Sequence, residues 1–303
     1  MKKVKCKPNR GKILFFIALL VLIIGTVVMG ADKLNIKIPV ASGENVLNNS
    51  EAAIDASNVN EGYIMAKYLG SSTGKIKLII EKSGGTAYTY DITLKNTYET
   101  FPLTEGSGKY KVTVYKNIGG TKYSTAYGTS VTANIKNEFS PFLYPNQYVN
   151  FTEKSAVVSQ GIKITEGCTT ELEKVQYIYN YVVGKFVYDY SKAKTVQSGY
   201  VPNVDLILSS KKGICLDYAS VMASMLRSQN IPAKLMVGYA GSAYHAWITV
   251  YIKDIGWVDN IIYFDGNGWK LMDPTFASTA SGGASSQVTF KPNENNYSAR
   301  FAY

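Results

Sequence analysis

The chain has 303 residues, enough for two domains of ordinary size. Hydrophobic residues make up 46% and charged residues 18%, so a packed core is expected and global disorder is not. The formal net charge is +10, but six of the 32 basic residues precede the first apolar run, which leaves 26 basic against 22 acidic residues in the rest. No basic stripe with interleaved aromatic residues stands out, so nucleic acid is not expected as a partner.

The first 31 residues predict either a signal peptide or an N-terminal membrane anchor. A basic segment, MKKVKCKPNRGK, is followed by an uncharged run from Ile13 to Gly30. A basic region before an apolar run is typical of export signals, and Gly30 and Ala31 could end a cleavage site. The run also approaches the ~20 residues that span a bilayer, and its basic flank would stay in the cytoplasm. We therefore expect the rest of the chain to be anchored at the extracellular face of the membrane or secreted.

Residues 32–58 are polar with little periodicity and predict a linker. Over residues 59–137, apolar and polar residues alternate between Gly- and Ser-rich turns, which predicts an antiparallel sandwich of about six or seven strands, similar to a bacterial immunoglobulin-like module. The many tyrosines here are interpreted as half-buried strand residues; the alternative is a surface that stacks on sugars. The segment from Asn137 to Tyr148 is a candidate joint between domains.

A second domain is predicted over residues 150–280, where the apolar period becomes helical. The segment from Thr169 to Phe186 predicts a helix that Thr169 or Thr170 caps, with acidic residues in its first turn. Residues 281–303 form a C-terminal tail, which starts as a flexible linker and could end as a strand or a docked segment. The face expected to be buried on the helix consists of Leu172, Val175, Ile178, Tyr179 and Val182.

Cys215 falls at the start of a further predicted helix, from Leu216 to about Asn230. Unpaired N–H groups and the positive end of the helix dipole favour a thiolate there, which would make the thiol a nucleophile. Gly213 would let the chain turn into the helix without a side chain in the way. The alternatives are an inert buried cysteine and a disulfide with Cys168, which would occupy the nucleophile.

The chain has one histidine, His245, at the start of a strand pattern. A reactive thiol needs a group that takes and returns a proton, and this is the only imidazole available. A predicted hairpin over FDGNGW leads to Asp273, followed by Pro274. If the strand leading to Asp273 lies beside the strand that starts at His245, its carboxylate can orient the imidazole. Taken singly, each of these residues has a plain structural explanation.

The three segments together resemble the transglutaminase-like superfamily, which has a papain-like fold. The matching residues are KGICLDYASVMASMLRSQNIPAKLMVGY, YHAWITV and WKLMDPT, in this order and with their key residues 30 and 28 positions apart. The resemblance implies an α+β core, in which the helix bearing the cysteine packs on an antiparallel sheet. It further implies Cys215 as nucleophile, His245 as base and acid, and Asp273 as the orienting acid. One oxyanion donor would be the Cys215 N–H, and Tyr188 is a candidate for the other.

The resemblance implies attack on protein or peptide amides through a thioester. Leu216 stands where animal transglutaminases have Trp, and no Asp-rich loop for calcium is present. With one His and three Cys, no ordinary zinc site can be assembled, so neither metal nor cofactor is expected. The favoured function is therefore an exported cysteine peptidase acting on proteins or peptides, including those of the cell wall or surface. Two alternatives stay open: a protein-glutamine gamma-glutamyltransferase, and a non-catalytic cell-surface binding protein.

Overall fold

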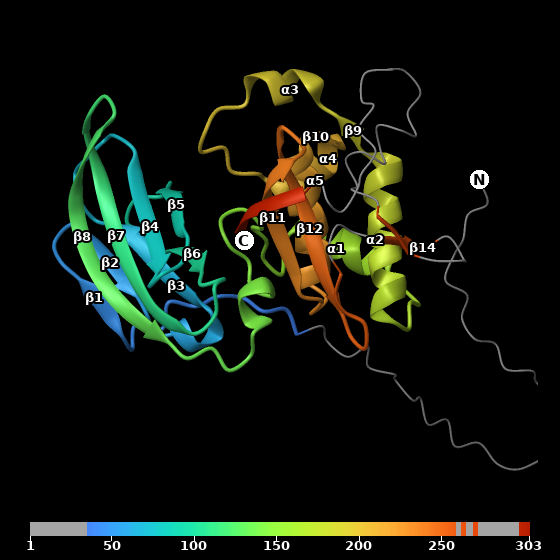
Figure 1. Ribbon diagram of the computed structural model, residues 1–303, viewed down its shortest axis with the longest axis horizontal. Coiled ribbons are helices and arrows are strands. Elements are labelled where there is room, and N and C mark those ends of the chain that lie inside the picture. Colours follow the sequence, from blue (N-terminus) through green and yellow to red (C-terminus); the bar gives the residue numbers. More distant parts are fainter. Residues whose placement is uncertain (1–34, 259–261, 265–268, 272–296) are drawn as a thin grey trace, which may run out of the picture.

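The computed structural model describes residues 35–258, 262–264, 269–271 and 297–303. They form a β-sandwich domain, followed by a domain in which helices pack on an antiparallel sheet (Figure 1). This arrangement confirms the expected α+β fold class. The predicted signal or anchor, with its apolar run from Ile13 to Gly30, lies outside the described residues. No helix in the described part of the chain is long and apolar enough to cross a membrane.

The sandwich consists of two four-stranded antiparallel sheets. The first has the order β1-β2-β3-β6, and the second has the order β5-β4-β7-β8, with β5 at an edge. The strands of the first sheet are β1 (Val46–Asn48), β2 (Ala52–Asp55), β3 (Tyr63–Tyr68) and β6 (Glu99–Pro102). Those of the second are β4 (Ile76–Lys82), β5 (Ala87–Ile92), β7 (Gly108–Gly119) and β8 (Lys122–Ala133).

The expected linker over residues 32–58 is wrong for residues 46–55, which form β1 and β2 of the first sheet. Their turn is closed by the Asn49 side chain, which accepts hydrogen bonds from the N–H groups of Glu51 and Ala52. Ile54 is fully buried at the centre of β2. Strands of three and four residues are too short to show the alternation that identified the other strands.

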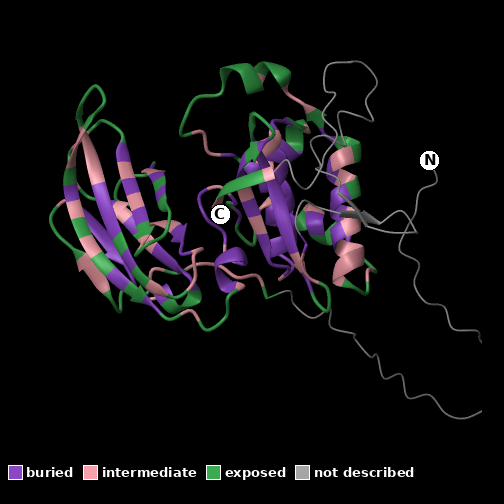
Figure 2. Cartoon of the chain, viewed as in Figure 1, coloured by how far each residue is buried: buried purple, intermediate pink, exposed green. Residues whose placement is uncertain are grey.

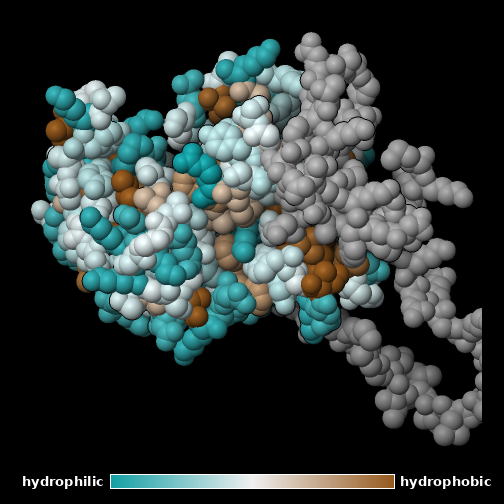
Figure 3. All heavy atoms as spheres, in the orientation of Figure 1, coloured by the Kyte–Doolittle hydropathy of each residue, from teal (hydrophilic) through white to brown (hydrophobic). Residues whose placement is uncertain are grey.

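The tyrosines of the sandwich are mainly core residues. Tyr68, Tyr90 and Tyr110 are at most 2% exposed, while the residues that alternate with them along the strands are more exposed (Figure 2). Hydrophilic residues cover much of the visible outer face of the sandwich (Figure 3). This favours the interpretation of these tyrosines as strand residues over sugar stacking.

The second domain is built around α5 (Cys215–Arg227), which packs against β11 (Ala233–Ala240) and β12 (Ala243–Ile252) on one side and against helices on the other. The sheet has the order β13-β12-β11-β16. Its edge strands are β13 (Gly256–Val258) and β16 (Tyr297–Ala302). The other helices are α1 (Ala156–Ile164), α2 (Glu171–Lys185), α3 (Tyr190–Thr195) and α4 (Val204–Ser210).

Helix α2 begins as the sequence predicts. Thr170 is its N-cap, and its hydroxyl accepts a hydrogen bond from the Glu173 N–H at 3.2 Å. The Glu173 carboxylate accepts in return from the Thr170 N–H at 3.1 Å, which completes a capping box. Four of the five residues expected on the inner face are buried, and the fifth, Leu172, is partly buried.

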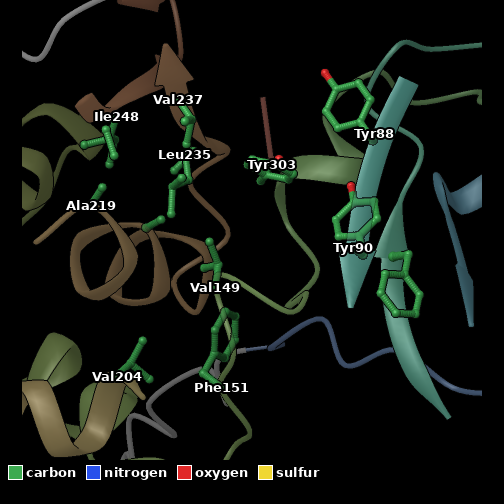
Figure 4. Close-up of a cluster of buried hydrophobic side chains, with 14 of the residues drawn as sticks. Tyr88, Tyr90, Val149, Phe151, Val204, Ala219, Leu235, Val237, Ile248 and Tyr303 are labelled. Atoms are coloured by element: carbon green, nitrogen blue, oxygen red, sulfur yellow. The ribbon is translucent and has the colours of Figure 1, made fainter. Parts of the chain in front are cut away.

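The joint between the domains is packed against both. It contains a 3-10 turn (Ser140–Phe142), and Val149 and Phe151 beyond it are buried. One continuous hydrophobic cluster runs from β5 through Tyr303 to α5 and β12 (Figure 4). The guanidinium of Arg227, fully buried at the end of α5, donates to the main-chain oxygens of Tyr144, Ala233 and Tyr303. The joint, the sheet and the tail are therefore fixed to one another.

Candidate active site

Cys215 is the first residue of α5 and is partly buried. It follows β10 (Lys212–Gly213), whose parallel partner is β9 (Val187–Tyr188). Neither Cys215 nor Cys168 is in a disulfide. The disulfide between them that the sequence left open is therefore not formed. The nucleophile candidate thus lies at a helix N-terminus, where the dipole favours an anion.

Asp217 fixes the start of α5. Its carboxylate, fully buried, accepts hydrogen bonds from the Ile214 N–H at 2.9 Å, from Lys192 Nζ at 2.6 Å and from the Tyr200 hydroxyl at 2.7 Å. Burial and the neighbouring Asp217 raise the pKa of Tyr200, which therefore remains a protonated donor at neutral pH. Three donors occupy the Asp217 carboxylate, as expected of a capping residue, and it is not available as the base for Cys215.

Gly213 is needed for close packing. A Cβ atom placed on it would lie 2.6 Å from Cβ of Asp217 and 2.8 Å from its Oδ2. The sequence predicted a glycine that permits a turn, but the backbone of Gly213 is not in the left-handed region. The structural requirement is space for the carboxylate that caps the helix.

His245 lies on β12, opposite Gly238 of β11, and is 7% exposed. Its ring is 6.5 Å from the rings of Trp247 and Tyr297, measured between centroids. His245 and Cys215 line one cleft of about 680 Å³. The structure therefore brings the predicted nucleophile and the predicted base, which are 30 positions apart in sequence, into the same cleft.

Tyr188 lines the same cleft. The parallel pair places it opposite Gly213, two residues before Cys215, and the Asp189 N–H donates to the Gly213 carbonyl at 2.8 Å. Its ring lies 4.9 Å from that of Tyr190. This position agrees with the predicted neighbourhood of the oxyanion, and its role as a donor stays a prediction.

Asp273 lies outside the described residues. The predicted hairpin before it is present, as β14 (Ile262–Phe264) paired with β15 (Trp269–Leu271). Among the described strands, however, β15 pairs with β14 and not with β12, whose partners are β11 and β13. The adjacency proposed for orienting His245 is therefore not seen in the described strands, and the role of Asp273 stays a prediction.

The sequence missed the other wall of the cleft, which belongs to the sandwich. The sandwich lines this wall with Lys77, Thr89, Tyr90 and Asp91. Figure 1 shows β5 on the side of the sandwich that faces the second domain. The joint and the end of the tail complete this wall with Gln147, Tyr148, Phe301 and Tyr303. No local pattern signals such a wall, because it forms only when the two domains pack together.

Tyr244 was also missed, although it directly precedes His245. It lines the cleft, and burial raises its pKa, with Arg300 opposing this shift and Tyr239 and Cys215 adding to it. Its hydroxyl therefore stays protonated at neutral pH and could donate within the cleft. Among the described residues, no group of three or more His, Cys, Asp or Glu side chains could hold a metal ion.

Residues 159–274 match the family described as "Transglutaminase-like superfamily". The chain is 23% identical over 192 residues to "Uncharacterized protein YebA" of Bacillus subtilis, covering 54% of this chain and 25% of the relative. It is 32% identical over 76 residues to the "Protein-glutamine gamma-glutamyltransferase" of Pseudomonas aeruginosa, covering 24% of this chain and 11% of the relative. The chain thus spans a quarter or less of the length of both relatives.

Among solved structures, the chain is similar to "a Putative Cysteine Protease from Cytophaga hutchinsonii". The two share 17% identity with a TM-score of 0.36, and the match covers 78% of this chain and 71% of that one. The family expected from the three motifs is confirmed by the family match, which includes both Cys215 and His245. Residues 159–274 of this chain thus form a core of the transglutaminase-like superfamily.

Proposed function

We propose that this chain is a thiol enzyme that attacks amide bonds of proteins or peptides, with hydrolysis as the main outcome. The observation that carries the proposal is the joint position of Cys215, at the N-terminus of α5, and His245 in one cleft. The superfamily core supports the same chemistry. Tyrosine side chains also line the cleft, and a tyrosine hydroxyl can donate a hydrogen bond.

In this proposal the Cys215 thiolate attacks the amide carbon, and the carbonyl π electrons move to the oxygen. When the tetrahedral intermediate collapses, the C–N bond breaks and His245, as imidazolium, gives its proton to the departing nitrogen. A thioester and a free amine result. Water then attacks the thioester while His245 takes its proton. The new intermediate collapses, which releases a carboxylic acid and returns the thiolate. The Cys215 N–H and Tyr188 are the proposed donors to the oxyanion.

The second candidate is crosslinking of glutamine to an amine. The relative from Pseudomonas aeruginosa is named for that reaction, and it supports the candidate over a short stretch. The chemistry differs only in the second step, in which a lysine amine attacks the thioester in place of water. A third possibility is that the cleft only binds. Residues 1–31 support the further proposal that the enzyme acts outside the cytoplasm, on surface or cell-wall proteins.

Alkylation by iodoacetamide tests the thiol chemistry, and Cys168 is an internal control within the same chain. Cys168 is also partly buried but does not line the cleft. Peptide mapping by mass spectrometry would follow both thiols together. We expect Cys215 to react faster than Cys168, and we expect His245→Ala to slow Cys215 while leaving Cys168 unchanged. Equal, slow labelling of both thiols in the wild-type chain and in the His245→Ala variant would instead support a binding protein.

The outcome of the second step can be determined by mass. The full chain would be incubated with surface proteins and a labelled primary amine. Cleaved chains would indicate a peptidase. A gain of the amine label at glutamine would indicate crosslinking, and conversion of glutamine to glutamate would indicate hydrolysis of the side-chain amide. The Cys215→Ala chain is the control, since each product should disappear with the thiol.

A further inference from the structure

The edge of β5 that forms part of the cleft has unpaired main-chain groups. Among the described strands, β5 pairs with β4 alone, so its second edge has no partner strand in this part of the chain. The Asp91 carbonyl accepts a hydrogen bond from Gln147 Nε2 at 2.6 Å. The main-chain groups of Asp91 therefore point away from β4. Because alternate residues of a strand direct their main-chain groups to the same edge, Thr89 points its N–H and C=O that way too.

The unpaired groups lie on the wall opposite the candidate nucleophile. Thr89 and Asp91 line the same cleft as Cys215 and His245. The main-chain N–H of Asp91 and both main-chain groups of Thr89 have no partner among the described residues. Thr89 is exposed, so this part of the edge is open to the cleft. An unpaired strand edge is a template for a further strand.

The remaining features of the wall indicate a ligand with both donors and acceptors. Tyr90 Oη and Gln147 Oε1 are buried without a hydrogen-bond partner among the described residues. The Asp91 carboxylate is already paired with Lys77 Nζ at 3.0 Å, so the wall offers no uncompensated charge. A neutral row of alternating N–H and C=O groups matches the main chain of an extended polypeptide, whose groups repeat every second residue. A sugar chain has no such repeat.

One end of this edge is bounded by the second domain. A Cβ atom on Gly199, in the segment after α3, would lie 2.5 Å from Oδ2 of Asp91. The segment that reaches β5 is held by Tyr200, whose hydroxyl bonds Asp217 at the start of α5. The edge of β5 and the helix bearing Cys215 are therefore linked through two adjacent residues of one segment, which contributes to fixing the distance between them.

We propose that the sandwich domain holds the substrate: an extended, unfolded polypeptide segment pairs with the free edge of β5 at Thr89–Asp91 and passes Cys215. This inference rests on the proposed function for the reaction, and it adds the part of the chain that recognises the substrate. It gives the sandwich a role in substrate binding, beyond that of a spacer. It also restricts the substrate to unstructured segments, because a folded helix cannot pair with a strand edge.

Hydrogen exchange tests the pairing without any turnover. The full chain carrying Cys215→Ala, kept soluble in mild detergent, would be mixed with a pool of randomised eight-residue peptides at millimolar concentration. We expect slower exchange at the amides of Thr89 and Asp91, with no change at Tyr88 and Tyr90, whose main-chain groups face β4. A pool of oligosaccharides is the second arm. Unchanged exchange at Thr89 and Asp91 with peptides, or slowing with oligosaccharides alone, would overturn the proposal.

Two variants at one position separate the main chain from the side chain. Thr89→Pro removes the N–H on the free edge and keeps the ladder to β4, because edge strands tolerate proline on their open side. Thr89→Val keeps the N–H and the shape. In the chain with an intact thiol, we expect Thr89→Pro to lower kcat/KM for the peptide pool about tenfold, as expected for loss of a main-chain hydrogen bond, and Thr89→Val to lower it much less. Equal values for the two variants would contradict the pairing.

The rate of Cys215 alkylation distinguishes this inference from the proposed function. Thr89→Pro should not change that rate, because Thr89 takes no part in the thiol chemistry. Slowed exchange at Thr89 and Asp91 together with slow alkylation would support the docking edge and contradict the enzyme. Fast, His245-dependent alkylation without slowed exchange would support the enzyme and contradict the docking edge.

Discussion

Helices α2 and α5 begin with the same device in different surroundings. In both, the third residue of the helix is acidic and accepts a hydrogen bond from the N–H of the residue before the helix. At α2 this residue is Glu173, which is partly exposed and bonds Thr169 and Thr170 among the residues that the structure describes. At α5 it is Asp217, which is fully buried and bonds Lys192 and Tyr200 as well.

The difference shows that a helix start becomes a site through what is packed around it. A cysteine lies near each start: Cys168 precedes α2, and Cys215 is the first residue of α5. Only Cys215 lines the cleft with His245. At α5 the capping carboxylate also holds the segment with Lys192 and Tyr200 against the helix, so one buried group fixes both the thiol and part of the cleft wall. At α2 the same motif only starts a helix.

The largest expected effect comes from replacing each of the two thiols in turn. Under the proposed function, Cys215→Ala should lower turnover of a peptide substrate by at least about 10⁴-fold, because the nucleophile is lost. Cys168→Ala should leave turnover unchanged, since it does not line the cleft. Steady-state kinetics with mass detection of products would measure both. Comparable losses in the two variants would mean that the two helix starts do not differ in the way proposed.

The two capping residues should differ in how much they contribute to the free energy of unfolding. Asp217→Ala leaves the Lys192 ammonium without its 2.6 Å partner and the Ile214 N–H without an acceptor. Lys192 is partly exposed and still bonds the Tyr200 hydroxyl, so we expect a loss of about 2–3 kcal/mol, below that of a fully buried pair. Thr170→Ala removes the cap of α2 and should cost about 1 kcal/mol. Urea unfolding of the two variants would give both values, and a larger loss in Thr170→Ala would contradict the role assigned to burial.

Two glycines offer a further matched pair. Alanine at Gly213 would bring its Cβ within 2.6 Å of Asp217, so Gly213→Ala should destabilise the protein by about 1–3 kcal/mol and slow alkylation of Cys215. Gly184 lies inside α2 with open space where a Cβ would be. Gly184→Ala should therefore stabilise the protein by about 0.5–1 kcal/mol. Thermal unfolding of both variants would test the pair, and a stabilising Gly213→Ala would show that the capping carboxylate is not tightly packed.

The sequence predicted both helix starts because their signals are local. Thr170 and Glu173 are three residues apart, and the apolar period of each helix is visible within one segment. The same holds for the strand that begins near His245. The partners of Asp217 were not predicted, because Lys192 lies 25 residues away and Tyr200 lies 17 away, with no periodicity to connect them.

The cleft could be predicted only on one side. Motif order indicated that Cys215 and His245 meet, but Thr89 and Asp91 come from another domain more than 120 residues earlier. Their position depends on how the joint, Arg227 and the strand β16 hold the two domains together. Such contacts result from the packing of finished elements. The sequence of each element alone carries no signal for them.

The smallest expected effect is on the pH dependence of stability, and the two helix starts should respond at opposite ends of the pH scale. Hydrogen bonds from Thr169 and Thr170 lower the pKa of Glu173 below its ordinary 4.5, so its contribution is present above that pH and is lost as pH falls. Burial, together with Asp217, raises the pKa of Tyr200 above its ordinary 10.0. Its contribution is therefore present below pH 10 and is lost as pH rises further.

Substitution of each group should remove one side of this dependence. In Glu173→Gln, stability should fall less between pH 5 and pH 3 than in the wild-type chain. In Tyr200→Phe, it should fall less above pH 10, although the variant starts from a lower value because Asp217 loses a donor. Urea midpoints measured across pH would show both effects. If Tyr200→Phe does not change the loss of stability above pH 10, other buried tyrosines must dominate that loss. One such residue is Tyr148, whose pKa is raised to about 12 by burial.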